Sequence, residues 1–393
     1  MPTIVHINDK LSLSGGVEIY ISQVDALLQQ YGWTSYWVAL TWCGSHVEIK
    51  SNEKKLCWQG PLNKLKDSPM VKLVQKKRGL LHVHSLSSPL LLNALFDFAP
   101  VVRTMHEPRL FCPGQGKFWR ADEEPCTIPV GFHCIYHTYQ KRCCNRHPLR
   151  LLKALKNTRY ELTTAGRHYS AIIANSHWTA NQAVVAGLPS EKIKVIPYFT
   201  RNLEHTPIPK HNLAKILFVG RLTKEKGLHY LLHALKIIHD SGKNIHLDIV
   251  GDGHERVFFE RKVDEFSLHK KCIFHGWLGR EQIQERFRKC NAVAFPSIYP
   301  EAFGIVGIEA MMHGRPVVAF DVGGVPEWLH DKVSGHLVPP KQVEMFASSL
   351  MQLCSNYGYA SQLGHAGRAI AMEKFIPETH MSLLMALYRK ILV

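Results

Sequence analysis

Short apolar runs alternate with helical patterns along the first half of the chain. Residues 3–7 (TIVHI) have the length of a buried strand, and a helical pattern follows through Ile19, Ile21, Val24, Leu27 and Leu28. Helical stretches are expected at 90–96 and 179–185. Later apolar runs predict five further strands: SYWVALTW from Ser35, LLHVHS from Leu80, VVRTM from Val101, AIIANS from Ala171 and KVIPYF from Lys194. Strands that alternate with helices predict βαβ units and a parallel sheet.

The second half repeats this alternation. Its predicted strands are KILFVG, HLDIVG, CIFHGW, AVAF, PVVAF and HLVPP, and an amphipathic helix is expected over 377–393. Between the halves, residues 201–212 (RNLEHTPIPKHN) are polar, carry two prolines and follow neither period, which indicates a linker. A chain of 393 residues also exceeds the size at which one core usually divides. We therefore expect two α/β domains, at 1–205 and 206–376, followed by the helix 377–393.

The segment 296–326 predicts a phosphate-binding corner. An apolar run ending at Phe295 leads through a proline-containing loop to Gly304, and a helical pattern starts at Ile305. The first backbone N–H groups of a helix suit a phosphate. Glu301 in the loop and Glu309 in the helix are better suited to accept hydrogen bonds from hydroxyls of the same ligand.

Three other places could contact a ligand. Arg221 and Lys226 flank the start of a predicted helix and could hold a diphosphate. Gly15 and Gly16 lie between a strand and a helix, where the backbone can approach a phosphate, although such pairs are often simple turns. His106 follows the carboxyl end of a predicted strand, where parallel sheets bind ligands.

His82 and His84 alternate in an apolar strand, so we expect structural side chains, one buried and one partly exposed.

Composition and charge narrow the class of protein. The formal net charge is +16, and residues 1–205 hold 25 basic against 14 acidic residues. This excess of basic residues favours an anionic binding partner, which could be a lipid surface, nucleic acid or a phosphorylated substrate. Alternatively, the basic residues form a solvated surface that binds no partner. No apolar stretch reaches the roughly 18 residues of a spanning helix. The first residues show no basic and apolar leader, so we expect a cytoplasmic location and reduced thiols.

A cysteine-rich insert follows His106, from Leu110 to about Pro148. It contains five of the ten cysteines, and the spacing matches no C-x2-C zinc ribbon. A long loop without a period of its own needs a stabilising element, which in a reducing compartment favours zinc over disulfides. A structural zinc site and free thiols both remain open. The candidate ligands are Cys112, Cys126, Cys134 and Cys143. Because the insert begins beside His106, we also expect it to shape the site of a second substrate.

The chain resembles the retaining glycosyltransferases of the GT-B fold, in the family called group 1 or family four. The resemblance is most specific over 215–340, where the motifs are GRL-x3-KG at 220–227, VGDG at 250–253, HGW at 275–277, the E-x7-E pair Glu301 and Glu309, GGVPE at 323–327 and SGHLVPP at 334–340. The first half resembles the family more loosely, through SGGVE at 14–18 and TMHE at 104–107. Nearly the whole chain is thus covered, by motifs of unequal specificity.

The resemblance implies two Rossmann-like domains with parallel sheets that face a cleft, and a last helix that returns to the first domain. By position, Arg221, Lys226 and the N–H groups of Gly304, Ile305 and Val306 would bind the donor diphosphate. Glu301 would accept from the donor sugar and Glu309 from the ribose. Gly16 would approach the phosphate from the first domain, and His106 would contact the sugar or the acceptor.

The expected activity is transfer of a sugar from a nucleotide sugar to a glycan, lipid-linked or lipopolysaccharide-type acceptor. Retention favours same-face internal return, while double displacement through Glu301 is the alternative. Side chains and backbone would hold the diphosphate, so no catalytic cofactor is expected. Rival functions are an epimerase-like nucleotide-sugar enzyme and a non-catalytic basic surface that binds lipid or nucleic acid. Nucleic acid is disfavoured, since no basic run is interleaved with aromatic residues. A basic first domain also fits a peripheral enzyme at the inner face of an anionic membrane.

Overall fold

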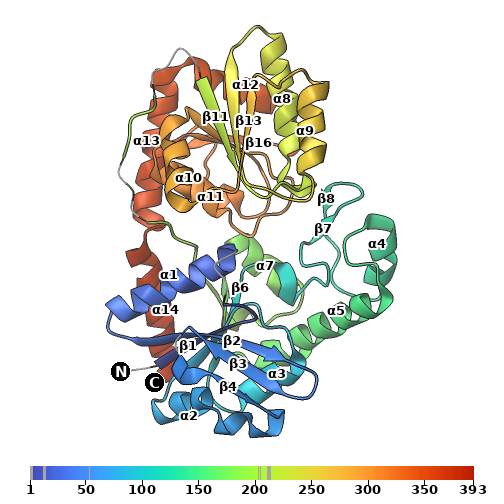
Figure 1. Cartoon of the computed structure of the whole chain (residues 1–393), viewed down its shortest axis with the longest axis vertical. Coiled ribbons are helices and arrows are strands. Elements are labelled where there is room, and N and C mark those ends of the chain that lie inside the picture. The colour runs from blue at the N-terminus through green and yellow to red at the C-terminus, as the bar shows by residue number, and fades with distance from the viewer. Residues whose placement is uncertain (1–2, 12–14, 53, 202, 204, 210–213) are drawn as a thin grey trace. The chain divides into compact units, whose positions relative to one another are not determined.

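The computed structural model describes residues 3–11, 15–52, 54–201, 203, 205–209 and 214–393, which form two units. The first unit comprises residues 1–117, 126–197 and 380–393, and the second comprises residues 118–125 and 198–379. The sequence placed the boundary within 201–212, a linker that lies partly outside the described residues. Figure 1 shows a sheet with flanking helices in each unit.

The first unit contains an eight-stranded sheet in the order β10-β9-β6-β5-β1-β2-β3-β4. Its strands are β1 Thr3–Asn8, β2 Thr34–Trp42, β3 Val47–Ser51, β4 Trp58–Gly60, β5 Leu80–Val83, β6 Val101–Met105, β9 Ala171–Ala174 and β10 Ile193–Val195. The strands from β10 to β2 pair in parallel, while β2, β3 and β4 pair antiparallel at one edge. All residues of β1, β5, β6 and β9 are buried, as expected for central parallel strands.

The first unit also contains helices, most of which pack on this sheet, whereas α4 stands away from it (Figure 1). They are α1 Gly16–Gln30, α2 Pro69–Lys76, α3 Pro89–Phe96, α4 His133–Lys141, α5 Pro148–Tyr160, α6 Gly166–His168, α7 His177–Val185 and all but the first turn of α14 Pro377–Leu392. The sequence predicted the six strands that form the parallel part of the sheet. It missed β3 and β4, and it extended β10 through residues 196–199, which do not continue the strand.

The second unit has a six-stranded sheet in the order β13-β12-β11-β14-β15-β16, and every pair is parallel. Its strands are β11 Ala214–Val219, β12 Ile245–Val250, β13 Cys272–Gly276, β14 Ala292–Phe295, β15 Val317–Phe320 and β16 Gly335–Val338. Its helices are α8 Leu228–Asp240, α9 Arg256–Glu265, α10 Arg280–Lys289, α11 Ile305–Met312, α12 Val343–Ser355 and α13 Tyr357–Lys374. This is the alternation that the sequence predicted.

The cysteine-rich insert is more structured than its sequence suggested. It contains the short hairpin of β7 Phe118–Trp119 and β8 Glu124–Pro125, and then helix α4. The hairpin groups with the second unit, where the Arg120 side chain pairs with Glu225 at 2.6 Å. Within the described residues, no helix combines the length and the apolar character needed to cross a membrane.

Candidate functional site

The loop between β14 and α11 is fastened to the turn that follows β11. Gly227 has a φ of 70°, and a Cβ there would lie 1.8 Å from the carbonyl oxygen of Pro296, so only glycine permits this approach. The backbone carbonyl of Glu225 accepts hydrogen bonds from the N–H groups of Ile298 and Tyr299 at 3.1 and 3.3 Å. These contacts bring the GRL-x3-KG motif against the E-x7-E motif.

Glu301 and Lys226 form an ion pair at this junction. The Lys226 Nζ donates to Glu301 Oε1 at 2.5 Å, and the two side chains are 24% and 10% exposed. The Glu301 backbone carbonyl accepts from the N–H of Gly324 at 2.8 Å, while a Cβ on Gly323 would lie 2.2 Å from the same carbonyl oxygen. The GGVPE motif therefore fixes the backbone of Glu301, and the Lys226 ammonium group compensates the negative charge of the Glu301 carboxylate.

The start of α11 offers backbone N–H groups without a side-chain cap. Gly304 is the N-cap residue with a φ of 101°, and Gly304, Ile305 and Val306 all keep some solvent exposure. Trp328 supports this turn from below: its Nε1 donates to the Phe303 carbonyl at 2.6 Å, and its ring would collide with a Cβ at Gly307. The sequence did not single out Trp328, although its place directly after GGVPE was a usable signal.

Glu309 lies on α11 and carries a perturbed carboxyl. Burial raises the pKa of Glu309 to about 7, while the nearby Arg280 guanidinium acts in the opposite direction. Arg280, the first residue of α10, did not emerge from the sequence, because nothing local connects it with Glu309. A carboxyl that is half protonated near neutral pH responds strongly to any ligand that donates hydrogen bonds to it.

Arg221 is exposed in the turn after β11. Next to it, the Leu222 N–H donates to the Asp252 carbonyl at 3.0 Å, and a Cβ on Gly253 would lie 2.5 Å from the Leu222 carbonyl oxygen. The GRL and VGDG motifs are thus packed against each other. Arg221, Lys226, Glu301 and the α11 N-terminus lie in the turns and loops that follow the carboxyl ends of β11 and β14, and Glu309 lies in the second turn of α11. This is the edge at which parallel sheets bind ligands.

The remaining two candidate residues, Gly16 and His106, lie in the first unit. Gly16 is the exposed first residue of α1, and a Cβ there would meet no atom within 4 Å. His106 follows β6, and burial together with Arg103 and Arg109 lowers the pKa of His106 to about 3. The imidazole is therefore neutral at physiological pH.

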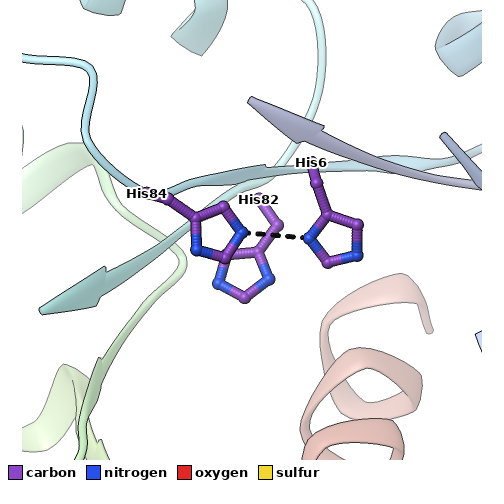
Figure 2. A group of neighbouring side chains, drawn as sticks. All are labelled: His6, His82 and His84. Atoms are coloured by element: carbon purple, nitrogen blue, oxygen red, sulfur yellow. Dashed lines mark hydrogen bonds between the residues drawn. The ribbon is translucent and has the colours of Figure 1, made fainter. Parts of the chain in front are cut away.

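His106 ends a chain of hydrogen-bonded histidines that the sequence did not predict. Its Nε2 pairs with His84 Nδ1 at 2.9 Å, and His84 Nε2 pairs with His6 Nδ1 at 3.0 Å. Figure 2 shows the second of these bonds and the ring of His82 beside it. The expectation of one partly exposed histidine was wrong, since His82 and His84 are both buried. The cause is distant in sequence: the Tyr388 hydroxyl of α14 pairs with His82 Nδ1 at 2.5 Å.

Potential metal ligands occur in two places in the first unit. His6, His82 and His84 form the one set of three or more ligand atoms within 4.8 Å of one another among the described residues. Both nitrogens of His82 and of His84 are already hydrogen-bonded, which disfavours a metal there. In the insert, Cys112, Cys126, Cys134 and Cys143 are partly buried and form no disulfide, and no three of their sulfur atoms lie within 4.8 Å of one another. Burial, and then the neighbouring Cys112, raises the pKa of Cys143 to about 11, with a smaller effect of Cys126.

Comparison with known proteins agrees with this reading of the second unit. Residues 201–370 match the family model "Glycosyl transferases group 1". An uncharacterized glycosyltransferase of Methanocaldococcus jannaschii is 34% identical over 41% of this chain and 40% of its own length. The lipopolysaccharide 1,2-N-acetylglucosaminetransferase of Salmonella typhimurium is 29% identical over 39% of this chain and 45% of its own. The chain thus matches less than half the length of these curated relatives.

Among solved structures, Anabaena HepE in complex with UDP-glucose superposes with a TM-score of 0.66 at 20% identity, over 99% of this chain and 98% of that one. This likeness confirms the fold predicted from the sequence, a GT-B arrangement of two Rossmann-like domains. The sequence similarity to the glycosyl transferases group 1 lies in this chain's segment 201–370.

Proposed function

We propose that the chain is a retaining glycosyltransferase whose second unit binds the nucleotide-sugar donor. The observation that carries the proposal is one corner of that unit, where the Lys226–Glu301 pair adjoins the uncapped start of α11 in a segment that matches the family. Cationic and N–H groups suit a diphosphate, and partly buried carboxylates suit hydroxyls. The HepE complex contains UDP-glucose, which makes a uridine diphosphate sugar the first donor to test.

Each residue of the corner has a proposed role. Arg221, Lys226 and the N–H groups of Gly304, Ile305 and Val306 hold the diphosphate, whose negative charge grows as the sugar leaves. Lys226 has three N–H donors, so it can keep its bond to Glu301 and also reach a phosphate oxygen. Glu301 accepts from the sugar hydroxyls, and Glu309 accepts from the ribose. In the first unit, the backbone at Gly16 meets the phosphate and His106 contacts the sugar or the acceptor.

The pairing of Glu301 favours same-face internal return over double displacement. In internal return, the bond from the anomeric carbon to the leaving phosphate breaks, the acceptor oxygen bonds to the same face, and the acceptor proton passes to a phosphate oxygen. Glu301 would have to attack the anomeric carbon in the alternative, and its ion pair with Lys226 makes the carboxylate a weaker nucleophile. We assign no catalytic metal, because the side chains and backbone N–H groups already supply positive charge.

We propose a glycan, lipid-linked or lipopolysaccharide-type acceptor, with the insert shaping its site. The named activity of the Salmonella relative supports this class. Because nucleotide sugars are cytoplasmic metabolites, such a reaction belongs at the inner face of the membrane and contributes to cell-envelope polysaccharide.

Transfer assays with paired variants test the proposal. Nucleotide sugars labelled in the sugar are incubated with envelope lipid and polysaccharide extracts. We expect Glu301→Gln, Lys226→Ala and Arg221→Ala to lose most turnover while remaining folded. Glu285 and Lys289 form a matched control pair, at 2.6 Å on the exposed face of α10. If Glu285→Gln and Lys289→Ala lose as much turnover as the site variants, the assignment is wrong.

The same assay separates the rival functions. An epimerase-like enzyme converts one nucleotide sugar into another without an acceptor, and a non-catalytic basic protein consumes no donor. Either result would replace the transferase proposal.

We also propose a structural zinc site formed by Cys112, Cys126, Cys134 and Cys143. Its support is the mutual influence of these thiols, together with the Lys117 N–H that lies 3.4 Å from Cys112 Sγ, a contact that stabilises a metal-bound thiolate. Protein purified under reducing conditions should contain one zinc per chain, and Cys126→Ser should lose it. The exposed Cys57 offers the control substitution. Purified protein without stoichiometric zinc contradicts the site.

A further inference from the structure

Helices α4 and α5 of the insert present apolar side chains to solvent. On and next to α4, Phe132 is 85%, Tyr136 63% and Tyr139 47% exposed. At the start of α5, Leu149 is 72% and Leu152 55% exposed. Both helices belong to the first unit, and they follow each other in the chain (Figure 1). We call these five residues the insert face.

The spacing of the insert face is helical, so its side chains gather on one side of each helix. Positions 132, 136 and 139 are separated by four and three residues, and positions 149 and 152 by three. Thr138 and Leu151 are the buried residues of the respective helices near these positions. An amphipathic helix of a globular protein normally turns its aromatic side inward. Here the aromatic side faces solvent, which is typical of a surface that binds a protein, a membrane or another ligand.

The segment that carries the insert face has only basic charges. From Cys126 to Tyr160 the chain has seven Lys or Arg residues and no Asp or Glu. On α5, Arg150, Lys153, Lys156 and Arg159 are all exposed. The partner is therefore anionic and has an apolar layer behind its charges.

We propose that the insert face docks the protein on an anionic phospholipid membrane, with Phe132, Leu149 and Leu152 entering the boundary of the acyl chains. Tyr136 and Tyr139 suit the level of the headgroups, where tyrosine is enriched, and the basic residues of α5 contact the lipid phosphates. Nucleic acid would match the positive charge, but it gives Leu149 and Leu152 nothing to contact. An acidic protein partner is the remaining alternative, which the test below addresses.

This inference rests on the proposed function in one respect, since docking would bring the enzyme to a lipid-linked acceptor. The docking itself is measured without turnover. Intact protein is floated with vesicles of phosphatidylcholine, with or without phosphatidylglycerol. We expect binding only to the vesicles that contain phosphatidylglycerol, and less of it at high salt.

Two variants test the face, and a third controls for net charge. Phe132→Ser with Leu149→Ser removes apolar contacts from exposed positions, where folding is unaffected. Arg150→Glu, Lys153→Glu and Lys156→Glu together reverse the charge. The loss of each basic residue should weaken binding about fivefold. The control makes the same charge change on the exposed Lys66, Lys72 and Lys76 in and before α2.

Binding that falls with both face variants and persists in the control supports the proposal. Equal loss in the control shows that net charge alone is responsible, and unchanged binding in the face variants places the contact elsewhere; either result overturns it. Binding of RNA or an acidic protein, with no binding to vesicles, overturns it as well.

A Tyr136→Trp variant adds a direct measurement of contact with lipid, because brominated lipid should quench the fluorescence of the introduced indole. The melting shift caused by UDP-glucose, measured in the same variants, tests the donor site separately from docking.

Discussion

Glu309 gives the sharpest prediction for the donor site, because its charge state depends on its surroundings. Burial raises the pKa of its carboxyl from 4.5 to about 7, so charging Glu309 opposes folding. This penalty is absent below pH 4.5, grows as the pH rises to 7, and then stays constant. A shift of this size corresponds to about 3 kcal/mol, and we expect about 2 kcal/mol, since the residue keeps some contact with water.

Replacement of the carboxyl should remove the penalty. We expect Glu309→Gln to melt higher than the parent protein at pH 8, and at nearly the same temperature at pH 4, in thermal unfolding without ligand. The difference should appear between those two pH values. A variant that is destabilised equally at both would show that the carboxylate is already well compensated in the folded protein.

Donor binding should release a proton from the same group. Ribose hydroxyls that donate to the carboxylate stabilise its charged form and lower the pKa of Glu309. From a starting pKa of about 7, binding at pH 7 should release about half a proton per donor molecule. Calorimetric titration of UDP-glucose in phosphate and in Tris measures this release as a difference in apparent enthalpy. Equal enthalpies in the two buffers, or the same release in Glu309→Gln, would refute the assignment of Glu309 to the ribose.

Two further predictions concern the packing of the corner. Lys226→Ala leaves the poorly solvated Glu301 carboxylate without its ion-pair partner, and should lower the free energy of unfolding by about 2 kcal/mol. The exposed control Lys289→Ala should change the free energy of unfolding by less than about 0.5 kcal/mol. Thermal melting compares the two variants. Gly227→Ala places a Cβ 1.8 Å from the Pro296 carbonyl oxygen, so it should both destabilise the unit and weaken donor binding by more than about tenfold. Gly242 has a similar φ of 78° but open space around it, so Gly242→Ala measures the effect of backbone strain alone. An equal loss of donor binding in Gly242→Ala would contradict the packing argument.

The sequence predicted the second unit well because its constraints are local. Gly227 and Gly304 have positive φ, and Gly307 packs directly against an aromatic ring, so each leaves a mark at a fixed place in a motif. The strands of the sheet are largely apolar runs between such motifs, as in AVAF of β14 and VVAF of β15. Contacts between motifs were less accessible: the ion pair of Lys226 with Glu301 joins residues 75 positions apart.

The first unit was predicted less completely because its decisive contacts are long-range. The burial of His82 depends on Tyr388, which is 306 residues later. The antiparallel strands β3 and β4 are short, and β4, at the edge of the sheet, has no buried residue, so their sequence pattern resembles that of loops. Helix α4 was missed although Phe132, Tyr136 and Tyr139 have helical spacing, because a helix of nine residues shows that spacing only briefly.

Donor binding is the central claim, and a panel of nucleotide sugars tests it most directly through thermal melting. Ligand that binds only the folded protein raises the melting temperature by mass action. The account predicts that at least one nucleotide sugar, with UDP-glucose tested first, raises the melting temperature of the parent protein and of Lys289→Ala but not that of Lys226→Ala. A panel in which no nucleotide or nucleotide sugar shifts the parent protein would contradict it.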